Sequence, residues 1–190
     1  MKYKEASWFF ILICDLKEFF CVQKRGSHSM FDFFKKNKKF ELSSPVSGTL
    51  IDLSNVNDQV FSKRMMGDGL AIEPDDNKKE VVISSPVDGR IVSLPTSKHA
   101  FGIETKNKTE VLVHIGLDTV ELNGKGFKSY LKQGDNVKRG TKVISFNPDV
   151  IKANNLDDSV MVILTSGYNK KVIPKAEYNS KVKADQVLLE

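Results

Sequence analysis

Short apolar runs separated by turn residues dominate the chain from residue 40 onward. Each run is bounded by Gly, Pro, Asn or Asp, which is typical of β-strands joined by turns. The predicted strands are residues 49–53, 69–72, 81–83, 90–94, 101–103, 111–115, 142–146 and 159–164. No long segment has a helical period, and residues 149–155 are the best candidate for one short helical turn. The pattern therefore predicts an all-β protein, an antiparallel sandwich or barrel with at most short helical turns.

One eleven-residue stretch occurs twice in this β-rich part, 41 residues apart. Residues 43–53 read SSPVSGTLIDL and residues 84–94 read SSPVDGRIVSL, while a fainter pair is DNVK at 135–138 and SKVK at 180–183. In each copy the proline sets a strand entry and the glycine allows a tight turn or bulge. Chance is the weaker account of a match this long, so we expect two pseudo-symmetric halves packed face to face.

Composition places this pattern in one globular domain of 190 residues, because 40% of the residues are hydrophobic and 28% are charged. No run of eighteen apolar residues exists that could form a membrane-spanning helix. The net charge of +5 arises from 29 basic and 24 acidic residues spread along the chain. This mild surplus is too diffuse to indicate a nucleic-acid partner, and we expect none.

The first 29 residues differ from the rest of the chain, because they contain Cys14, Cys21 and Trp8, the only cysteines and tryptophan. Residues 25–30 read RGSHSM, which resembles a cloning linker followed by a start methionine. We interpret residues 1–29 as a non-native or upstream extension, disordered or variable, and Met30 as the natural start. The body then has no cysteine, which excludes thiol catalysis and cysteine-ligated zinc there.

Two alternatives remain for the extension. Residues 8–14 form an apolar run after two lysines, as in a signal peptide, but Asp15 ends the run and no small-x-small cleavage site follows. A native extension without a known role is the other alternative. The segment that follows, residues 30–40, interleaves aromatic residues with lysines. It is either a frayed, solvated terminus or a flexible amphipathic tail that makes weak contact with an anionic membrane.

After residue 29 the chain contains two histidines, His99 and His114. His114 lies in an apolar predicted strand, on the same face as Leu112 and opposite Val113. A lone histidine in such a strand is more often a satisfied structural residue than a functional one. Two imidazoles are too few to hold zinc without a carboxylate or a partner's ligand. As a pair, one can attack a phosphoryl group while the other donates to its oxygens, helped by Ser97 and by backbone N–H groups at residues 116–118.

Three separated motifs around these histidines resemble, in order, the glucose-type enzyme IIA of the bacterial phosphoenolpyruvate:sugar phosphotransferase system. They read MGDGLAI at residues 66–72, HAF at 99–101 and VHIGLDTVEL at 113–122, and GKGF at 124–127 and GDNVKRG at 134–140 also match. The similarity runs from about Met30 to the C-terminus, and it implies that residues 41–190 form an enzyme IIA domain. It implies the all-β sandwich of the family, two pseudo-symmetric halves of the duplicated hybrid motif type.

The resemblance also implies a phosphocarrier, a phosphotransferase component of sugar transport. His114 would receive a phosphoryl group from phosphohistidine on HPr and pass it to the cysteine of an enzyme IIB domain. His99 would stabilise the phosphoryl group, and Ser97, where the family often has threonine, would support that histidine. Asp118 and the backbone at Gly116 would shape the site. No cofactor is required, and the expected location is cytoplasmic.

The partner surface implied by the resemblance is apolar. It comprises Val60, Phe61, Met65 and Met66, together with Phe101, Ile115 and Gly116. Methionine side chains suit a surface that must bind more than one partner, although ordinary core packing is the alternative for Phe61. In this family the unphosphorylated form can also bind regulatory targets, including through a zinc ion shared by His99 and His114 with a partner.

Three other functions are alternatives to a phosphocarrier. A zinc peptidase of the lysostaphin type uses a related β architecture, and His114 and Asp118 have its His-x-x-x-Asp spacing, but the chain has no His-x-His pair. A lipoyl- or biotinyl-type carrier needs a lysine flanked by methionine at a hairpin tip, which is absent. A regulatory binding protein without phosphoryl transfer is the third. Phosphoryl acceptance by a neutral imidazole should fall as the pH drops below the pKa of His114.

Overall fold

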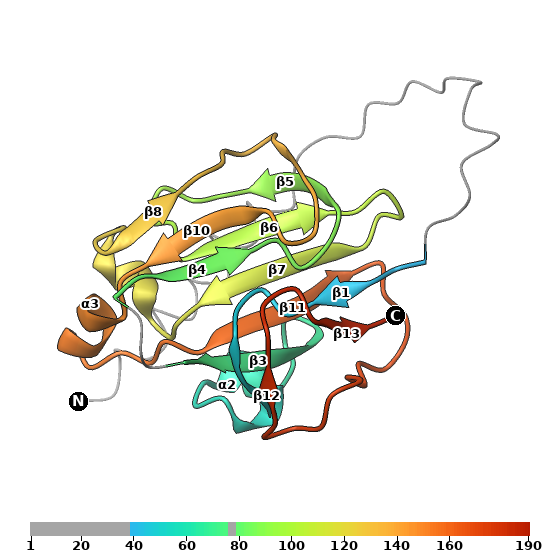
Figure 1. Cartoon of the computed structure of the whole chain (residues 1–190), viewed down its shortest axis with the longest axis horizontal. Helices are drawn as coiled ribbons and strands as arrows, with labels where there is room; N and C mark the ends of the chain where they lie inside the picture. The colour runs from blue at the N-terminus through green and yellow to red at the C-terminus, as the bar shows by residue number, and fades with distance from the viewer. Residues whose placement is uncertain (1–38, 76–78) are drawn as a thin grey trace. The chain divides into compact units, whose positions relative to one another are not determined.

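The structure is a computed structural model that describes residues 39–75 and 79–190 (Figure 1). The predictions for residues 1–29, and for all but the last two residues of the segment 30–40, lie outside these described residues. Those last two are tied to the C-terminal part of the domain. Lys39 forms an ion pair with Glu190 at 2.8 Å, and the Phe40 ring lies 5.2 Å from that of Tyr168, centroid to centroid.

Short antiparallel strands make up most of the described chain, and helices are few and short. The strands are β1 (Leu42–Ser43), β2 (Gly48–Asp52), β3 (Asp68–Pro74), β4 (Val81–Ser84), β5 (Gly89–Ser93), β6 (Ala100–Glu104), β7 (Glu110–Ile115), β8 (Phe127–Ser129), β9 (Asn136–Val137), β10 (Lys142–Phe146), β11 (Val160–Ser166), β12 (Lys181–Val182) and β13 (Val187–Leu189). The helical elements are η1 (Leu53–Asn55), α2 (Gln59–Ser62), η2 (Thr119–Leu122) and α3 (Pro148–Ala153). The predicted all-β class is confirmed.

Every predicted strand coincides with an observed one, with ends that differ by a few residues. The predicted helical turn at 149–155 is α3, which begins one residue earlier because Asn147 caps its N-terminus and Pro148 occupies the first turn. The predictions omitted the two-residue strands, β8, β13 and α2. These elements are too short to show a period, and they form where neighbouring segments supply hydrogen-bond partners.

The strands form an eight-stranded sheet in the order β12-β2-β3-β11-β7-β6-β5-β9, a three-stranded sheet in the order β4-β10-β8 and the pair β1-β13. Figure 1 shows β4 and β10 drawn across the β6 and β7 part of the larger sheet, and their apolar side chains share one core cluster. Val111, Val113 and Ile115 of β7 belong to this core, and Leu112 and His114 do not. The predicted division of this strand into two faces is therefore confirmed, and His114 lies on the outer face. No helix among the residues described is long and apolar enough to span a membrane.

The repeated stretch forms the same structure twice. The hydroxyl of Ser44 donates to the carbonyl of Val46 at 2.6 Å, and the hydroxyl of Ser85 donates to that of Val87 at 2.7 Å. The strand that follows pairs with β12 in one half and with β9 in the other, which are the fainter repeat in the sequence. The internal duplication predicted from the sequence is therefore present in the fold.

The two copies of the repeat are also hydrogen-bonded to each other. The N–H of Ser43 donates to the carbonyl of Pro86, and the N–H of Ser84 donates to that of Pro45, each at 2.9 Å. Such reciprocal bonds are expected between halves related by an approximate two-fold axis. The central strands β7 and β11 pair antiparallel between the halves, so His114 lies near the middle of the sheet.

Candidate functional site

His114 is the next-to-last residue of β7, with Ala100 of β6 and Met161 of β11 as its neighbours across the sheet. Its side chain is 3% exposed, and among the described residues neither ring nitrogen has a hydrogen-bond partner. Burial, and then repulsion by a protonated His99 ring, lower its pKa to about 3, while a contact with the Gly116 backbone that falls short of hydrogen-bond geometry acts in the opposite direction. Burial has this effect because a protonated ring would lose its hydration. His114 is therefore a neutral imidazole at physiological pH.

His99 lies directly before β6 and next to His114. The two rings have centroids 5.0 Å apart and are inclined at 72°, an edge-to-face arrangement. The N–H of Ile115 donates to the carbonyl of His99 at 2.7 Å, which fixes the backbone of one histidine against that of the other. Ser97 Oγ lies 2.7 Å from Nδ1 of His99. The structure therefore brings together the three residues Ser97, His99 and His114 that the sequence singled out.

The turn after β7 requires glycine at position 116. Gly116 has φ +72°, and a Cβ there would lie 2.4 Å from Cγ2 of Thr119 and 2.6 Å from the carbonyl oxygen of Asp157. Asp118 follows in a left-handed conformation and its side chain is exposed. The hydroxyl of Thr119 donates to the carbonyl of Ile115 and closes the turn.

The sequence also predicted that backbone N–H groups at residues 116–118 would bind phosphoryl oxygens. For two of them this expectation is wrong in the described conformation. The N–H of Gly116 donates to Ser159 O at 2.8 Å, and that of Leu117 donates to Asp157 O at 3.0 Å. A donor already paired inside the protein gains little from a second acceptor, so the N–H groups of Gly116 and Leu117 add little to the binding of a ligand here.

The short helix α2 covers His114 with an aromatic ring. The Asp58 carboxylate caps α2 by accepting from the N–H groups of Val60 at 2.8 Å and Phe61 at 3.0 Å. Phe61 is 2% exposed, and its ring centroid lies 5.0 Å from that of His114. The Phe61 side chain is therefore packed in the interior, as the core-packing alternative expects, and it shields His114 from water.

The predicted partner surface is only partly exposed. Phe101 and Ile115 are fully buried in the core, so the prediction that they contact partners is wrong for this conformation. Their positions alternate with outward-facing residues along β6 and β7, and the period of two directs them inward. Val60 is largely buried, whereas Met65 is 56% exposed. Met66 is half-buried, so the methionines remain the accessible apolar part of this surface.

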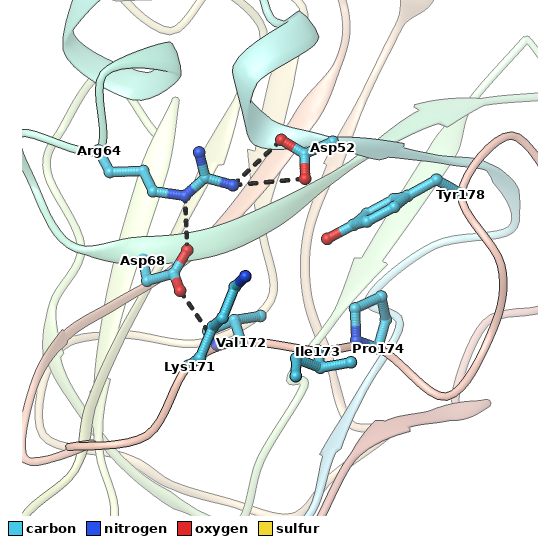
Figure 2. Close-up of a pocket in the computed structure, with 8 residues that line it drawn as sticks. All are labelled: Asp52, Arg64, Asp68, Lys171, Val172, Ile173, Pro174 and Tyr178. Atoms are coloured by element: carbon cyan, nitrogen blue, oxygen red, sulfur yellow. Dashed lines mark hydrogen bonds and ion pairs between the residues drawn. The ribbon is translucent and has the colours of Figure 1, made fainter.

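Sequence reasoning missed an ion-pair cluster next to α2. Arg64 Nε donates to Asp68 at 2.7 Å, and its Nη2 donates to Asp52 at 3.0 Å (Figure 2). Burial alone would raise the pKa of Asp52, but hydrogen bonds from Ser54 and Arg64 outweigh it and lower the pKa to about 2. The spacing of Arg64 and Asp68, four residues apart, was the available signal, but outside a helix it carries little weight.

Metal ligation was the other chemistry open to the histidine pair. Within residues 39–75 and 79–190 no group of three or more His, Cys, Asp or Glu side chains surrounds a common point. Two imidazoles can serve as a nucleophile and a hydrogen-bond donor, or as two of the four ligands that a zinc site needs, with the rest supplied from another molecule.

The chain is similar in sequence to a known protein family and to several of its members. A family model described as "phosphoenolpyruvate-dependent sugar phosphotransferase system, EIIA 1" matches residues 40–170. The glucose-specific EIIA component of Bacillus cereus is 40% identical over 137 residues, which cover 72% of this chain and 81% of that protein. That of Mycoplasma capricolum is 47% identical over 113 residues, covering 60% and 70%.

Two further similarities concern domain context and fold. The glucose-specific EIICBA component of Staphylococcus carnosus is 37% identical over 146 residues, which cover 77% of this chain and 21% of that longer protein. The solved structure of glucose permease IIA from Mycoplasma capricolum matches with a TM-score of 0.68 and 38% identity, covering 82% of this chain and 96% of that chain.

Proposed function

This chain belongs to the EIIA 1 family of the phosphoenolpyruvate-dependent sugar phosphotransferase system, and on that premise we propose that His114 is its phosphoryl carrier. Family membership makes the protein a phosphotransferase component of sugar transport. The donor in this proposal is phosphohistidine on HPr, and the acceptor is the cysteine of an enzyme IIB domain. The matched relative named EIICBA supports the second step, because such a chain joins an A domain to B and C domains.

One observation supports His114 most strongly. It is a buried imidazole whose ring nitrogens make no well-formed hydrogen bond among the described residues, and its centroid lies 5.0 Å from that of a second imidazole. A buried polar group without a hydrogen bond costs stability, so its presence calls for an explanation beyond packing. An attacking nitrogen must keep its lone pair available, and the lowered pKa ensures this.

The proposed transfer is a direct displacement at phosphorus. The lone pair of one His114 ring nitrogen forms the new N–P bond while the P–N bond to the donor histidine breaks. The electron pair of the broken bond stays on the donor nitrogen. In the next step a cysteine thiolate forms an S–P bond, and the pair of the N–P bond returns to His114. Such transfers depend on positioning and on stabilising charge on the phosphoryl oxygens.

His99 and Ser97 are proposed to supply that stabilisation. When the Ser97 hydroxyl donates to Nδ1 of His99, the ring proton resides on Nε2. That N–H can donate to a phosphoryl oxygen on the neighbouring His114. Exchange of His99 for glutamine should slow transfer onward to the IIB domain more than it reduces phosphorylation itself, since the phosphoryl group would lose a positioning contact.

We also propose roles for the residues around the histidine pair and a location for the protein. Met65 and Met66 offer an apolar contact surface for HPr and IIB, and Asp118 contributes an exposed carboxylate beside the site. Both partners act in the cytoplasm, which is the proposed location. The reaction uses only side chains and needs no cofactor; a zinc ion at His99 and His114 would need ligands from a regulatory partner. Weak membrane contact by residues 30–40 remains a prediction.

The proposal is tested by phosphorylating the protein with phosphoenolpyruvate, enzyme I and HPr and measuring its intact mass. The expected result is a gain of one acid-labile phosphoryl group in the wild type and in His99→Gln, and no gain in His114→Gln. A chase with an isolated IIB domain should remove the group quickly from the wild type and slowly from His99→Gln. A folded wild-type protein that takes up no phosphoryl group would contradict the proposal and would favour a purely regulatory binding protein.

A further inference from the structure

The two halves of the fold differ in the length of one connection near His114. Residues 53–67 join β2 to β3 and include η1 and α2, whereas the equivalent connection between β5 and β6 spans only residues 94–99. The longer connection places the Phe61 ring against the His114 ring, with centroids 5.0 Å apart and planes inclined at 55°. The shorter one carries Ser97 and His99. One half of the duplication therefore supplies the paired histidine, and the other supplies the cover.

Packing alone holds only the near part of this cover. Val60 and Phe61 are buried, but Arg64 and Met65, which follow them, are exposed. A cavity of about 590 Å³ opens beside Arg64, lined by Asp52, Asp68, Lys171, Val172, Ile173, Pro174 and Tyr178 (Figure 2). Side chains do not fill this space, so close packing does not fix the end of the loop.

The Arg64 guanidinium spans the loop instead. It bonds Asp68 at the start of β3 and both carboxylate oxygens of Asp52 at the end of β2, at 3.0 and 3.3 Å (Figure 2). The two carboxylates are themselves held by the backbone. Asp52 accepts from Ser54 N at 2.8 Å, and Asp68 accepts from Val172 N at 3.0 Å.

The backbone of Arg64 is also held in place at the end of α2. It has φ +54°, a left-handed conformation that a residue with a side chain adopts only where its surroundings hold it. Its N–H donates to the carbonyl of Phe61 at 2.9 Å, and its carbonyl accepts from Gly67 N at 3.2 Å. The side chain and the main chain of Arg64 thus connect the end of α2 to the ends of both strands.

We infer that Arg64 is a positioning residue that clamps residues 58–66 to β2 and β3 and so keeps Phe61 over His114. Single exposed ion pairs contribute little, but a guanidinium that bridges two prearranged carboxylates loses less side-chain entropy for each bond it makes. Loss of the clamp releases the exposed end of the loop first, and the contact between Phe61 and His114 then opens more often. The clamp is inferred from the contacts of Arg64 alone. Only its effect on phosphoryl transfer rests on the proposed role of His114.

The test compares Arg64→Gln with Arg64→Lys and with Arg139→Gln as a matched control. Arg139 also bridges two carboxylates, those of Glu41 and Asp185, but it lies in the turn between β9 and β10 and not on the loop that covers His114. The measurements are the rate at which diethylpyrocarbonate modifies His114 and the NMR shifts of its ring protons, which the Phe61 ring current displaces. Neither requires phosphoryl transfer, so failure here is distinguishable from failure of the proposed function.

In Arg64→Gln we expect His114 to be modified about fivefold faster and its ring-proton shifts to move toward those of an exposed histidine. Arg64→Lys should recover part of the difference, and Arg139→Gln should match the wild type. With HPr as donor, Arg64→Gln should alter kcat as well as KM. If Arg64→Gln does not fold, Asp52→Asn removes one of the two anchors and should give a smaller change in the same direction. Wild-type modification rates and shifts in folded Arg64→Gln or Asp52→Asn would overturn the inference.

Discussion

His114 is buried, and neither of its ring nitrogens makes a well-formed hydrogen bond within the described part of the chain. Burial keeps the imidazole neutral, because its pKa is lowered to about 3. The neutral ring is what a phosphoryl acceptor needs, but the arrangement costs stability when the pH falls. An unfolded chain exposes the same histidine with an ordinary pKa near 6.5. This difference in the pKa of His114 between the folded and unfolded states makes its burial measurable through the pH dependence of stability.

The first prediction concerns this difference. Between pH 6.5 and about 3 the unfolded ring binds a proton and the buried ring does not, so the free energy of unfolding should fall as the pH falls. Between pH 7.5 and 5.5 the contribution of His114 to this fall is about 1 kcal/mol. The measurement is denaturant unfolding at both pH values for the wild type and His114→Gln. The variant should show the smaller fall, and equal falls in the two proteins would contradict the burial described here.

The same lowered pKa bears on activity. Phosphoryl acceptance was expected to decline below the pKa of His114, and with a pKa of about 3 that decline lies well below pH 5. As far as the protonation of His114 is concerned, the rate of phosphoryl acceptance should therefore not change between pH 7.5 and 5.5.

The position of His114 on the outer face of β7 could be predicted from the period of two in the sequence. Its depth could not, because the cover comes from a loop distant along the chain.

At the scale of elements, α2 decides how the site is closed. The helix has a single turn, so it cannot be stable by its own hydrogen bonds. It is held by the Asp58 cap, by the burial of Val60 and Phe61 and by the contacts of Arg64. None of these has a periodic signature in the sequence, which explains why the strands could be predicted and α2 could not.

The second prediction tests the cap. Asp58→Ala removes the acceptor for the N–H groups of Val60 and Phe61 and should lower the free energy of unfolding by about 1 kcal/mol. It should also shift the NMR signals of the His114 ring, since Phe61 is no longer fixed above it. Asn147→Ala is the control, because Asn147 caps α3 in the same way. The control should lose similar stability and leave the His114 signals unchanged. Unshifted His114 signals in Asp58→Ala would refute the role given to the cap.

At the scale of the whole molecule, the internal duplication organises the fold. Equivalent serines, prolines and glycines form equivalent turns, and the two halves exchange backbone hydrogen bonds. This much was predictable from the repeated eleven residues. The asymmetry was harder to foresee, because it lies in what is inserted between the repeated segments. Residues 53–67 have no counterpart of similar length in the other half, and they contain the cover of His114.

The third prediction uses the symmetry. Ser44→Ala and Ser85→Ala each remove a buried hydroxyl that donates to a carbonyl two residues later. Each should lower the free energy of unfolding by about 1 kcal/mol, and the two losses should agree to within about 0.5 kcal/mol. Ser180→Ala removes an exposed hydroxyl that also donates to a carbonyl and should cost less. Chemical denaturation of the three variants measures this, and clearly unequal losses for Ser44 and Ser85 would show that the halves are not energetically equivalent.

The role of His114 as phosphoryl carrier is tested most directly by the phosphorus NMR spectrum of the protein after incubation with phosphoenolpyruvate, enzyme I and HPr. We expect one phosphohistidine resonance in the wild type, its retention in His99→Gln and its absence in folded His114→Gln. The accompanying proton spectrum should show the change at the ring of His114. A phosphohistidine signal that survives in His114→Gln would contradict the assignment of His114 as the phosphoryl carrier, because the phosphoryl group would then reside elsewhere in the chain.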